Sequence, residues 1–252
     1  MSTKKVVNKE VLRRMKTTIK VIEDVKEVRI CSTTNAPHKN TSAPRKFLGG
    51  EFHNISGKKK ETARERQAHA VNISVHSSTP ILTLPHEKCL LEIELLKTDA
   101  NRRFQSAEIH EDVFHKQLGT IIEKKLPIST YFGNVRDLVV KARENEYSHA
   151  LLDFCCQFAT IKDIIKTAMN NLIVEKGGVI TLTVNKRISS DWDFYTNIEK
   201  LNPQKVEDEK TRVEHAVTTF INRNGGDNWA IEDIFNYHDT TSMLLIVIRR
   251  IN

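Results

Sequence analysis

From Pro80 to the C-terminus, short apolar runs alternate with stretches of helical periodicity. Such alternation is typical of β-α-β units, in which crossover helices cover a mostly parallel sheet. Five strands are expected in the apolar runs at residues 81–84, 103–109, 128–132, 149–154 and 179–185. The helices between them are expected over residues 86–98, 111–125, 135–144 and 161–175. The pattern predicts an α/β domain.

The pattern changes after the fifth expected strand. Residues 186–206 form an aromatic-rich stretch that we interpret as irregular, and a helix is expected over residues 207–223. Beyond the Gly-Gly turn at 225–226, residues 230–237 and 243–250 are close enough in sequence to pair as an antiparallel hairpin. These two strands complete a seven-stranded, mostly parallel sheet with helices on both faces.

This order of elements over residues 79–252 resembles the class I S-adenosylmethionine-dependent methyltransferases, whose Rossmann-like sheet has the usual strand order 3-2-1-4-5-7-6. In that family the second strand ends in an acid that holds the ribose hydroxyls of the cofactor, and the resemblance assigns this role to Glu108 in RFQSAEI. Gly133 and Asn134 in YFGNVRDL would meet the adenine, with a bare turn as the alternative. Asp153, in ALLDFCCQF, would bind the cofactor and face its reacting methyl group.

The first turn departs from the family pattern. The first strand of the family leads into a glycine-rich E-x-G-x-G turn that lets the backbone approach the cofactor, whereas this chain has ILTLPHEKCLLE. Leu84, Pro85 and His86 must shape a different loop. Because a proline in the first turn of a helix leaves later N–H groups free, these three residues are still candidate cofactor contacts.

Methyl transfer from a sulfonium demands few fixed residues, because the leaving group is already activated and the protein mainly aligns the acceptor and removes a proton. Asp153 is the first catalytic candidate. Cys156 is a second, because Cys156-Gln157-Phe158 resembles the P-C-Q-x-F-S run of cytosine-C5 methylases, whose cysteine is a nucleophile. A half-buried packing thiol is the alternative reading of Cys156.

Candidate acceptor-binding residues follow the fifth expected strand. Lys186 and Asp153 are similar in order to two members of the Lys-Asp-Lys-Glu set of ribose 2'-O methylases. Trp192, Phe194 and Tyr195 are candidates for stacking on a base, with a hydrophobic staple of the loop as the alternative. No metal site is expected, because the histidines are scattered singly and the four cysteines lack zinc-site spacing.

The positive charge of the chain is concentrated at its start. Residues 1–79 contain 17 Lys and Arg against 7 Asp and Glu, and residues 80–252 contain 22 against 25. We therefore divide the chain into a basic N-terminal extension, residues 1–78, and a methyltransferase-like domain, residues 79–252. The extension is expected to hold an amphipathic helix over residues 9–28, a polar linker over 31–46 and a charged segment. Such a segment attracts phosphate backbones by counterion release, and a solubilising tail is the alternative.

Together these features predict an S-adenosylmethionine-dependent methyltransferase acting on DNA or RNA, held through the basic N-terminal third. A methyltransferase-fold protein that has lost catalysis, and binds nucleic acid or docks on a partner subunit, is the alternative that the missing glycine-rich turn leaves open. No run approaches the roughly 18 apolar residues that span a bilayer, and the N-terminus lacks the apolar run of a secretory signal. An intracellular location, cytoplasmic or nuclear, with reduced cysteines is therefore expected.

Overall fold

The computed structural model describes residues 59–74, 77–188, 191–201 and 208–252. The helix expected over residues 9–28 and the linker expected over 31–46 lie outside the described residues. All described residues belong to a compact unit that spans Ala43–Asn252. None of the helices in the described part of the chain has the length and apolarity needed to cross a membrane.

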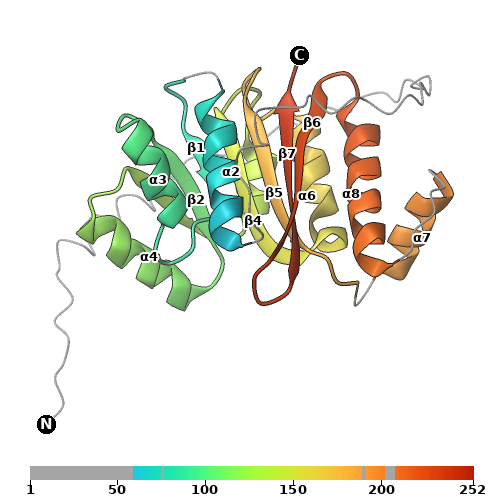
Figure 1. Ribbon diagram of the computed structural model, residues 1–252. Coiled ribbons are helices and arrows are strands. Elements are labelled where there is room, and N and C mark those ends of the chain that lie inside the picture. The colour runs from blue at the N-terminus through green and yellow to red at the C-terminus, as the bar shows by residue number, and fades with distance from the viewer. Residues whose placement is uncertain (1–58, 75–76, 189–190, 202–207) are drawn as a thin grey trace, which may run out of the picture. The chain divides into compact units, whose positions relative to one another are not determined.

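A seven-stranded sheet organises this unit, with strand order β3-β2-β1-β4-β5-β7-β6 (Figure 1). The first five strands run parallel to one another, and β7 is antiparallel to both of its neighbours, β5 and β6. The strands are β1 (Ile81–Thr83), β2 (Phe104–Glu108), β3 (Ile128–Phe132), β4 (His149–Gln157), β5 (Val179–Asn185), β6 (Trp229–His238) and β7 (Ser242–Arg250). The predicted fold class is therefore confirmed, including the closing hairpin.

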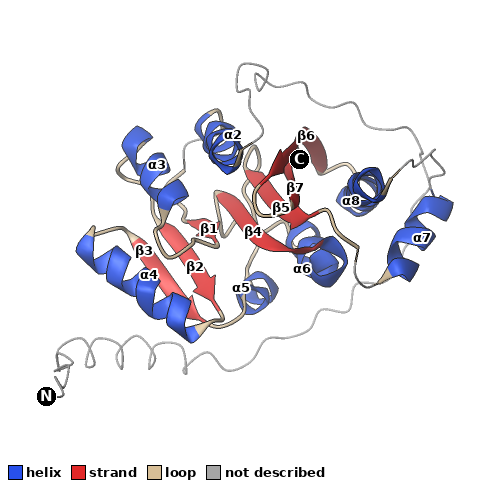
Figure 2. Ribbon diagram, turned by 60° about the horizontal axis from the view of Figure 1, so that its bottom comes forward, coloured by secondary structure: helices blue, strands red, loops and turns tan. Residues whose placement is uncertain are grey.

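Helices cover both faces of the sheet (Figure 2). The helices are α2 (Lys60–Asn72), α3 (Leu90–Thr98), α4 (Glu111–Glu123), α5 (Val135–Lys141), α6 (Phe158–Asn170), α7 (Trp192–Leu201) and α8 (Glu209–Gly225). Side chains alternate along each strand, so in β4 Leu151 packs toward α2 and α3, while Ala150 and Leu152 pack toward α5, α6 and α8. Each strand thus contributes to two apolar layers.

Several element bounds differ from the sequence prediction by a few residues, and three of the differences affect candidate site residues. Helix α3 begins at Leu90 rather than at residue 86, because Cys89 before it has a φ of +48°, outside the right-handed helical region. Strand β4 continues to Gln157, and its register against β5 shifts after Asp153 around Cys155, whose φ is +49°. The stretch 186–206, interpreted as irregular, contains helix α7. Its aromatic residues belong to a helix rather than to an open loop.

Helix α2 lies within the segment assigned to the N-terminal extension, yet it packs on the sheet. Ala70 and Val71 join the apolar layer beside α3, and Arg66 lies 2.7 Å from Asp233 with its guanidinium 4.3 Å from the centre of the Phe235 ring. The packed body therefore starts by the first residue of α2 and not at residue 79. The sequence hides this helix because its buried positions are mostly alanine and short polar residues, which give no apolar periodicity.

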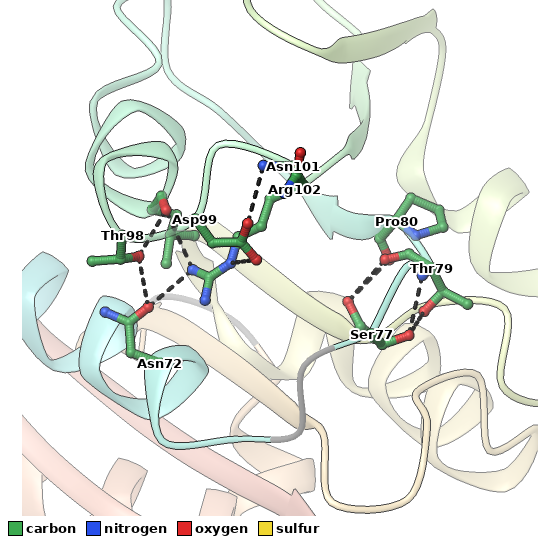
Figure 3. Close-up of polar contacts among 10 residues, drawn as sticks. Asn72, Ser77, Thr79, Pro80, Thr98, Asp99, Asn101 and Arg102 are labelled. Atoms are coloured by element: carbon green, nitrogen blue, oxygen red, sulfur yellow. Dashed lines mark hydrogen bonds and ion pairs between the residues drawn. The ribbon is translucent and has the colours of Figure 1, made fainter.

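Buried polar contacts tie this helix to the amino-terminal edge of the sheet (Figure 3). The Arg102 guanidinium donates from Nη1 to Asn72 Oδ1 at 2.9 Å, and its Nε lies 3.6 Å from a carboxylate oxygen of Asp99. Just before β1, the Thr79 amide donates to the Ser77 hydroxyl oxygen at 3.1 Å. The Arg102 contacts join the end of α2, the end of α3 and the segment before β2, and the Ser77–Thr79 contact shapes the chain just before β1.

Candidate cofactor cleft

A cleft of about 820 Å³ lies at the carboxyl ends of β1 to β4. It is bordered by the segments that follow these four strands and by α2, α6 and β6. Successive strands β1, β2 and β3 are added in one direction, and β4 is placed on the other side of β1. Open α/β sheets bind ligands at such a switch point, and the volume is in the range of small-molecule sites.

All seven of the predicted cofactor contacts lie at this cleft. The predicted residues that line it are Leu84, Pro85, His86, Glu108, Gly133, Asn134 and Asp153. They come from four segments that are far apart in the chain. The parallel strands bring the segments together because the carboxyl ends of such strands meet at one edge.

At the β2 end of the cleft, Glu108 is held in place on both carboxylate oxygens. Oε1 accepts from the His110 amide at 2.8 Å, and Oε2 accepts from Gln117 Nε2 at 3.4 Å. The Glu108 carbonyl oxygen accepts from the Gly133 amide at 2.9 Å. Gly133 has a φ of +157°, and a Cβ atom there would collide with the ring of Tyr131, so the chain that leaves β3 favours glycine at this position.

Asn134 has a structural role that the resemblance did not assign. Its Oδ1 accepts from the Arg136 amide at 2.9 Å and caps the N-terminus of α5. The residue still lines the cleft beside Gly133. The prediction of an adenine contact at Asn134 therefore stays a prediction, carried by position alone.

The loop after β1 is shaped by α4 instead of by glycines. Gln117 Nε2 donates to the Pro85 carbonyl oxygen, and the Thr120 hydroxyl donates to the Glu87 carbonyl oxygen at 2.7 Å. Gln117 is fully buried, and its Oε1 has no hydrogen-bond partner among the described residues. Sequence reasoning missed both side chains, since only the fold reveals that α4 runs beside this loop.

The floor of the cleft contains a buried acid, Glu92 of α3, which the sequence reading also missed. The Thr83 hydroxyl, at the end of β1, donates to Glu92 Oε1. Burial raises the pKa of Glu92 above its usual value, the hydrogen bond from Thr83 opposes this shift, and the charge of Asp153 adds to it. The available signal was an acid within the leucine-rich run LLEIELL, but that run contains two, Glu92 and Glu94, and the sequence does not tell which is buried.

Donor groups surround Asp153 at the β4 end of the cleft. The Cys155 thiol donates to Asp153 Oδ1 at 3.1 Å, and desolvation followed by the Asp153 charge raises the pKa of this thiol to about 12. Burial, again followed by Asp153, keeps the pKa of Tyr237 far above its usual value. Burial alone would lower the pKa of Lys60, but its hydrogen bond to Asp239 at 3.0 Å and the Asp153 charge raise it. All three donors therefore keep their protons at neutral pH.

Cys156 and Lys186 are not among the residues that line the cleft. Cys156 packs against the larger apolar layer, where burial raises its pKa, and its neighbour Cys155 faces the cleft instead. Asp153 and Cys155 are two residues apart along β4, so their side chains share the face of the cleft, and Cys156 lies on the opposite face. Lys186 is buried, with its Nζ 3.3 Å from Glu214 and 2.6 Å from Asn236 Oδ1, so its charge is already compensated.

The aromatic residues predicted to stack on a base also lie away from the cleft. Tyr195 is fully buried, and Phe194 packs against the rings of Phe158 and Phe220. Trp192 is 48% exposed, with the Arg212 guanidinium 5.5 Å from its ring centre. Two of the three rings therefore serve packing, because α7 turns them toward α6 and α8.

Comparison with known proteins rests on structure, since no protein-family model and no curated protein matches this sequence. A protein from Clostridium thermocellum, named as a candidate rRNA methylase, matches 79% of this chain and 99% of its own with a TM-score of 0.54 at 9% identity. The fold is that of a class I S-adenosylmethionine-dependent methyltransferase.

Two further structures share this class I fold. Fibrillarin, in its complex with Nop5p, matches 76% of this chain and 81% of its own with a TM-score of 0.51 at 13% identity. A protein from Corynebacterium glutamicum matches 79% of this chain and 84% of its own with a TM-score of 0.51 at 9% identity. At these identities the similarity establishes the class I fold of the chain, and the chemistry has to be argued from the cleft.

Proposed function

We propose that this protein is a methyltransferase that binds S-adenosylmethionine in the cleft at the carboxyl edge of its sheet. The observation that carries the proposal is the convergence of four strand ends on one cleft of about 820 Å³, at the switch point of a class I fold. The acidic residues of the cleft fit the cofactor. Glu108 offers a carboxylate that can accept hydrogen bonds from the ribose hydroxyls, and the acids Glu92 and Asp153 can interact favourably with the positive charge of the sulfonium.

The roles of the residues follow from their protonation and position. The bound cofactor supplies an activated methyl group, so the protein has to align an acceptor and manage one proton. Asp153 offers a carboxylate that can accept a hydrogen bond or the proton of the acceptor. Tyr237 and Lys60 keep their protons and can orient an acceptor as hydrogen-bond donors. Loop residues Pro85 and His86 form the wall that α4 holds in place.

For the acceptor we propose a nucleic acid. The support is the excess of 17 Lys and Arg over 7 Asp and Glu in residues 1–79, a segment that can neutralise a phosphate backbone. The end of this segment reaches the cleft, because Lys60 and Arg64 of α2 line it. The similarity in fold to a candidate rRNA methylase agrees with this choice.

Calorimetric titration with S-adenosylmethionine and S-adenosylhomocysteine tests the cofactor site. We expect micromolar binding by the wild type and binding at least about tenfold weaker in Glu108→Ala, since the variant loses hydrogen bonds to a charged group. Glu123→Ala, which removes an exposed acid at the far end of α4, is the matched control and should bind as the wild type does. A folded wild type that binds neither compound would contradict the proposal and favour a non-catalytic binding protein.

The nucleic-acid part is tested separately by deleting residues 1–46. The deletion should weaken nucleic-acid binding and flatten its dependence on salt concentration, because fewer counterions are released. Cofactor affinity should not change. An unchanged salt dependence would exclude the basic segment from acceptor binding.

A further inference from the structure

Glu92 is an unusual residue to find at the floor of a cleft. Its side chain is 1% exposed, and its hydrogen-bond donor is the neutral hydroxyl of Thr83. Within the described ranges, no Lys, Arg or His forms an ion pair with it. A buried carboxyl without a cation is costly in its charged form, so such a group is favourable only if something else compensates it.

A second acid lies on the same side of the sheet. Thr83 pairs in register with Leu151 of the neighbouring strand β4, and Asp153 follows Leu151 by two residues, so their side chains point to the same face. This is the face covered by α2 and α3, from which Glu92 approaches. The charge of Asp153 disfavours ionisation of Glu92.

The other titratable groups around Glu92 do not neutralise it. On its own helix, Cys89 is a buried thiol whose pKa is raised to about 12 by burial and then by the Glu92 charge. On α2, Lys60 hydrogen-bonds to Asp239 and Arg64 lies 3.6 Å from Glu61, although both line the same cleft. The floor of the cleft therefore has an excess of acid over cation.

We propose that Glu92 makes the cleft select a positively charged sulfonium ligand over its neutral thioether product, and that Glu92 loses its proton when the sulfonium compound binds. This inference rests on the proposed function, in which S-adenosylmethionine is the ligand and S-adenosylhomocysteine the product. The sulfonium carries a positive charge that the thioether lacks, so an uncompensated carboxyl distinguishes the two without any difference in shape. Release of the product follows from the same contrast.

The burial of Glu92 determines that binding of the sulfonium compound releases a proton. In the free protein burial raises the pKa of Glu92, so its protonated form persists to higher pH than that of an exposed glutamate. An opposite charge nearby lowers a carboxyl pKa by about 1 to 3 units, which expels that proton. Affinity for S-adenosylmethionine should therefore rise with pH through the pKa of the free protein and become constant above it. Affinity for S-adenosylhomocysteine should depend less on pH.

Calorimetry in two buffers of different ionisation enthalpy measures the proton released on binding, across a series of pH values. We expect the wild type to release a fraction of a proton with S-adenosylmethionine and less with S-adenosylhomocysteine. In Glu92→Gln, affinity for S-adenosylmethionine should fall about tenfold or more, with no proton release and no pH dependence, while affinity for S-adenosylhomocysteine falls less than about threefold. Glu94→Gln, on the same helix but exposed and paired with Lys97 at 2.7 Å, is the matched control.

A second variant keeps the test decisive if Glu92→Gln does not fold. Thr83→Val removes the hydroxyl that stabilises the charged carboxylate, so proton release should move to higher pH. Binding of S-adenosylmethionine without proton release, or release that persists in Glu92→Gln, would overturn the role of Glu92 and leave the proposed function standing. Failure of a folded wild type to bind either compound would instead overturn the proposed function itself.

Discussion

The two edges of the sheet are built from opposite charges. At the amino edge the arginines Arg102, Arg249 and Arg250 are buried or nearly so, and each has several partners. Arg250, for example, donates to the carbonyl oxygens of Leu172 and Val174 at 2.9 and 2.6 Å. The hollow that remains beside Arg102 measures only about 10 Å³, about enough for one water molecule.

The carboxyl edge instead exposes acids to an open cleft. Glu92, Glu108 and Asp153 line a space of about 820 Å³, and two of the cations that line it, Lys60 and Arg64, lie beside other acids. Removing a partner from a buried, hydrogen-bonded charge lowers the free energy of unfolding, whereas a charged group without a partner favours binding of a ligand with the opposite charge. The difference teaches that stability of this domain is concentrated at one edge and ligand binding at the other.

The largest effect that separates the edges is expected from Arg250→Ala. The change removes the Arg250 donor from the Val174 carbonyl and one of the two donors from the Leu172 carbonyl, which keeps the Asn145 amide, so the free energy of unfolding should fall by about 3 kcal/mol. Urea denaturation measures the loss, and the folded fraction should bind S-adenosylmethionine normally. Arg103→Ala, at an exposed position of the same edge, should cost less than about 0.5 kcal/mol. An equal loss of unfolding free energy in the two variants would contradict the assignment of stability to the buried arginines of the amino edge.

At the carboxyl edge, burial and then the charge of Asp153 should suppress thiol reactivity. Because the pKa of Cys155 is raised from 9.0 to about 12, its thiolate fraction at pH 8 should be roughly a thousandfold lower in the folded than in the unfolded chain, and its alkylation slower. Peptide mapping by mass spectrometry gives the rate at this residue, and Asp153→Asn should accelerate it. Because the unfolded thiol ionises first, this group also makes folding less favourable as the pH rises from about 9 toward about 12. Equal rates in both states would show that the edge does not carry the proposed negative field.

A smaller effect sharpens the comparison at the loop after β1. Thr120→Val removes the hydroxyl that donates to the Glu87 carbonyl oxygen, a contact worth about 1 kcal/mol. Cofactor affinity should fall about fivefold, with little change in the urea midpoint. Thr167→Val removes a comparable hydroxyl from the exposed side of α6, where it bonds within its own helix, and should leave affinity unchanged. An equal loss in both variants would assign the effect to helix stability.

The smallest effect is expected outside both edges. Trp192 is exposed and away from the cleft, so Trp192→Ala should change cofactor affinity by less than about twofold and stability by at most about 0.5 kcal/mol. Calorimetry and urea denaturation check both values. Phe194 and Tyr195 offer no equally clean test, because their rings pack in the interior. A large loss of cofactor affinity at Trp192 would extend the cleft toward α7.

The sheet and much of the cleft could be predicted because both depend on short-range patterns. Strand β3 and strand β5 have the expected bounds, and Glu108, Gly133 and Asp153 line one cleft as expected for residues at the ends of parallel strands. The alternation of apolar and helical runs is a local property of the chain. A parallel sheet then brings the strand ends together whatever the details of its loops.

Other parts of the cleft could not be predicted from the sequence, because they depend on contacts between distant segments. Helix α2 has no apolar periodicity, and Glu92 and Gln117 are ordinary helix residues until α3 and α4 are placed beside β1. Strand alternation places Cys155 on the same face as Asp153 and Cys156 on the opposite face. The resemblance of Cys156-Gln157-Phe158 to a catalytic run did not show which of these two faces meets the cleft, and only the placed strand decides it.

By itself the sequence determined the class of fold, the order of its elements and the strand ends that meet at the carboxyl edge. Apolar periodicity and glycine turns encode these features over a few residues at a time. Only the tertiary structure decided that α2 belongs to the domain, that α4 replaces the glycine-rich turn and that an uncompensated acid lies under the cleft. Burial and charge compensation are properties of the assembled layers, since they depend on what each side chain meets after folding.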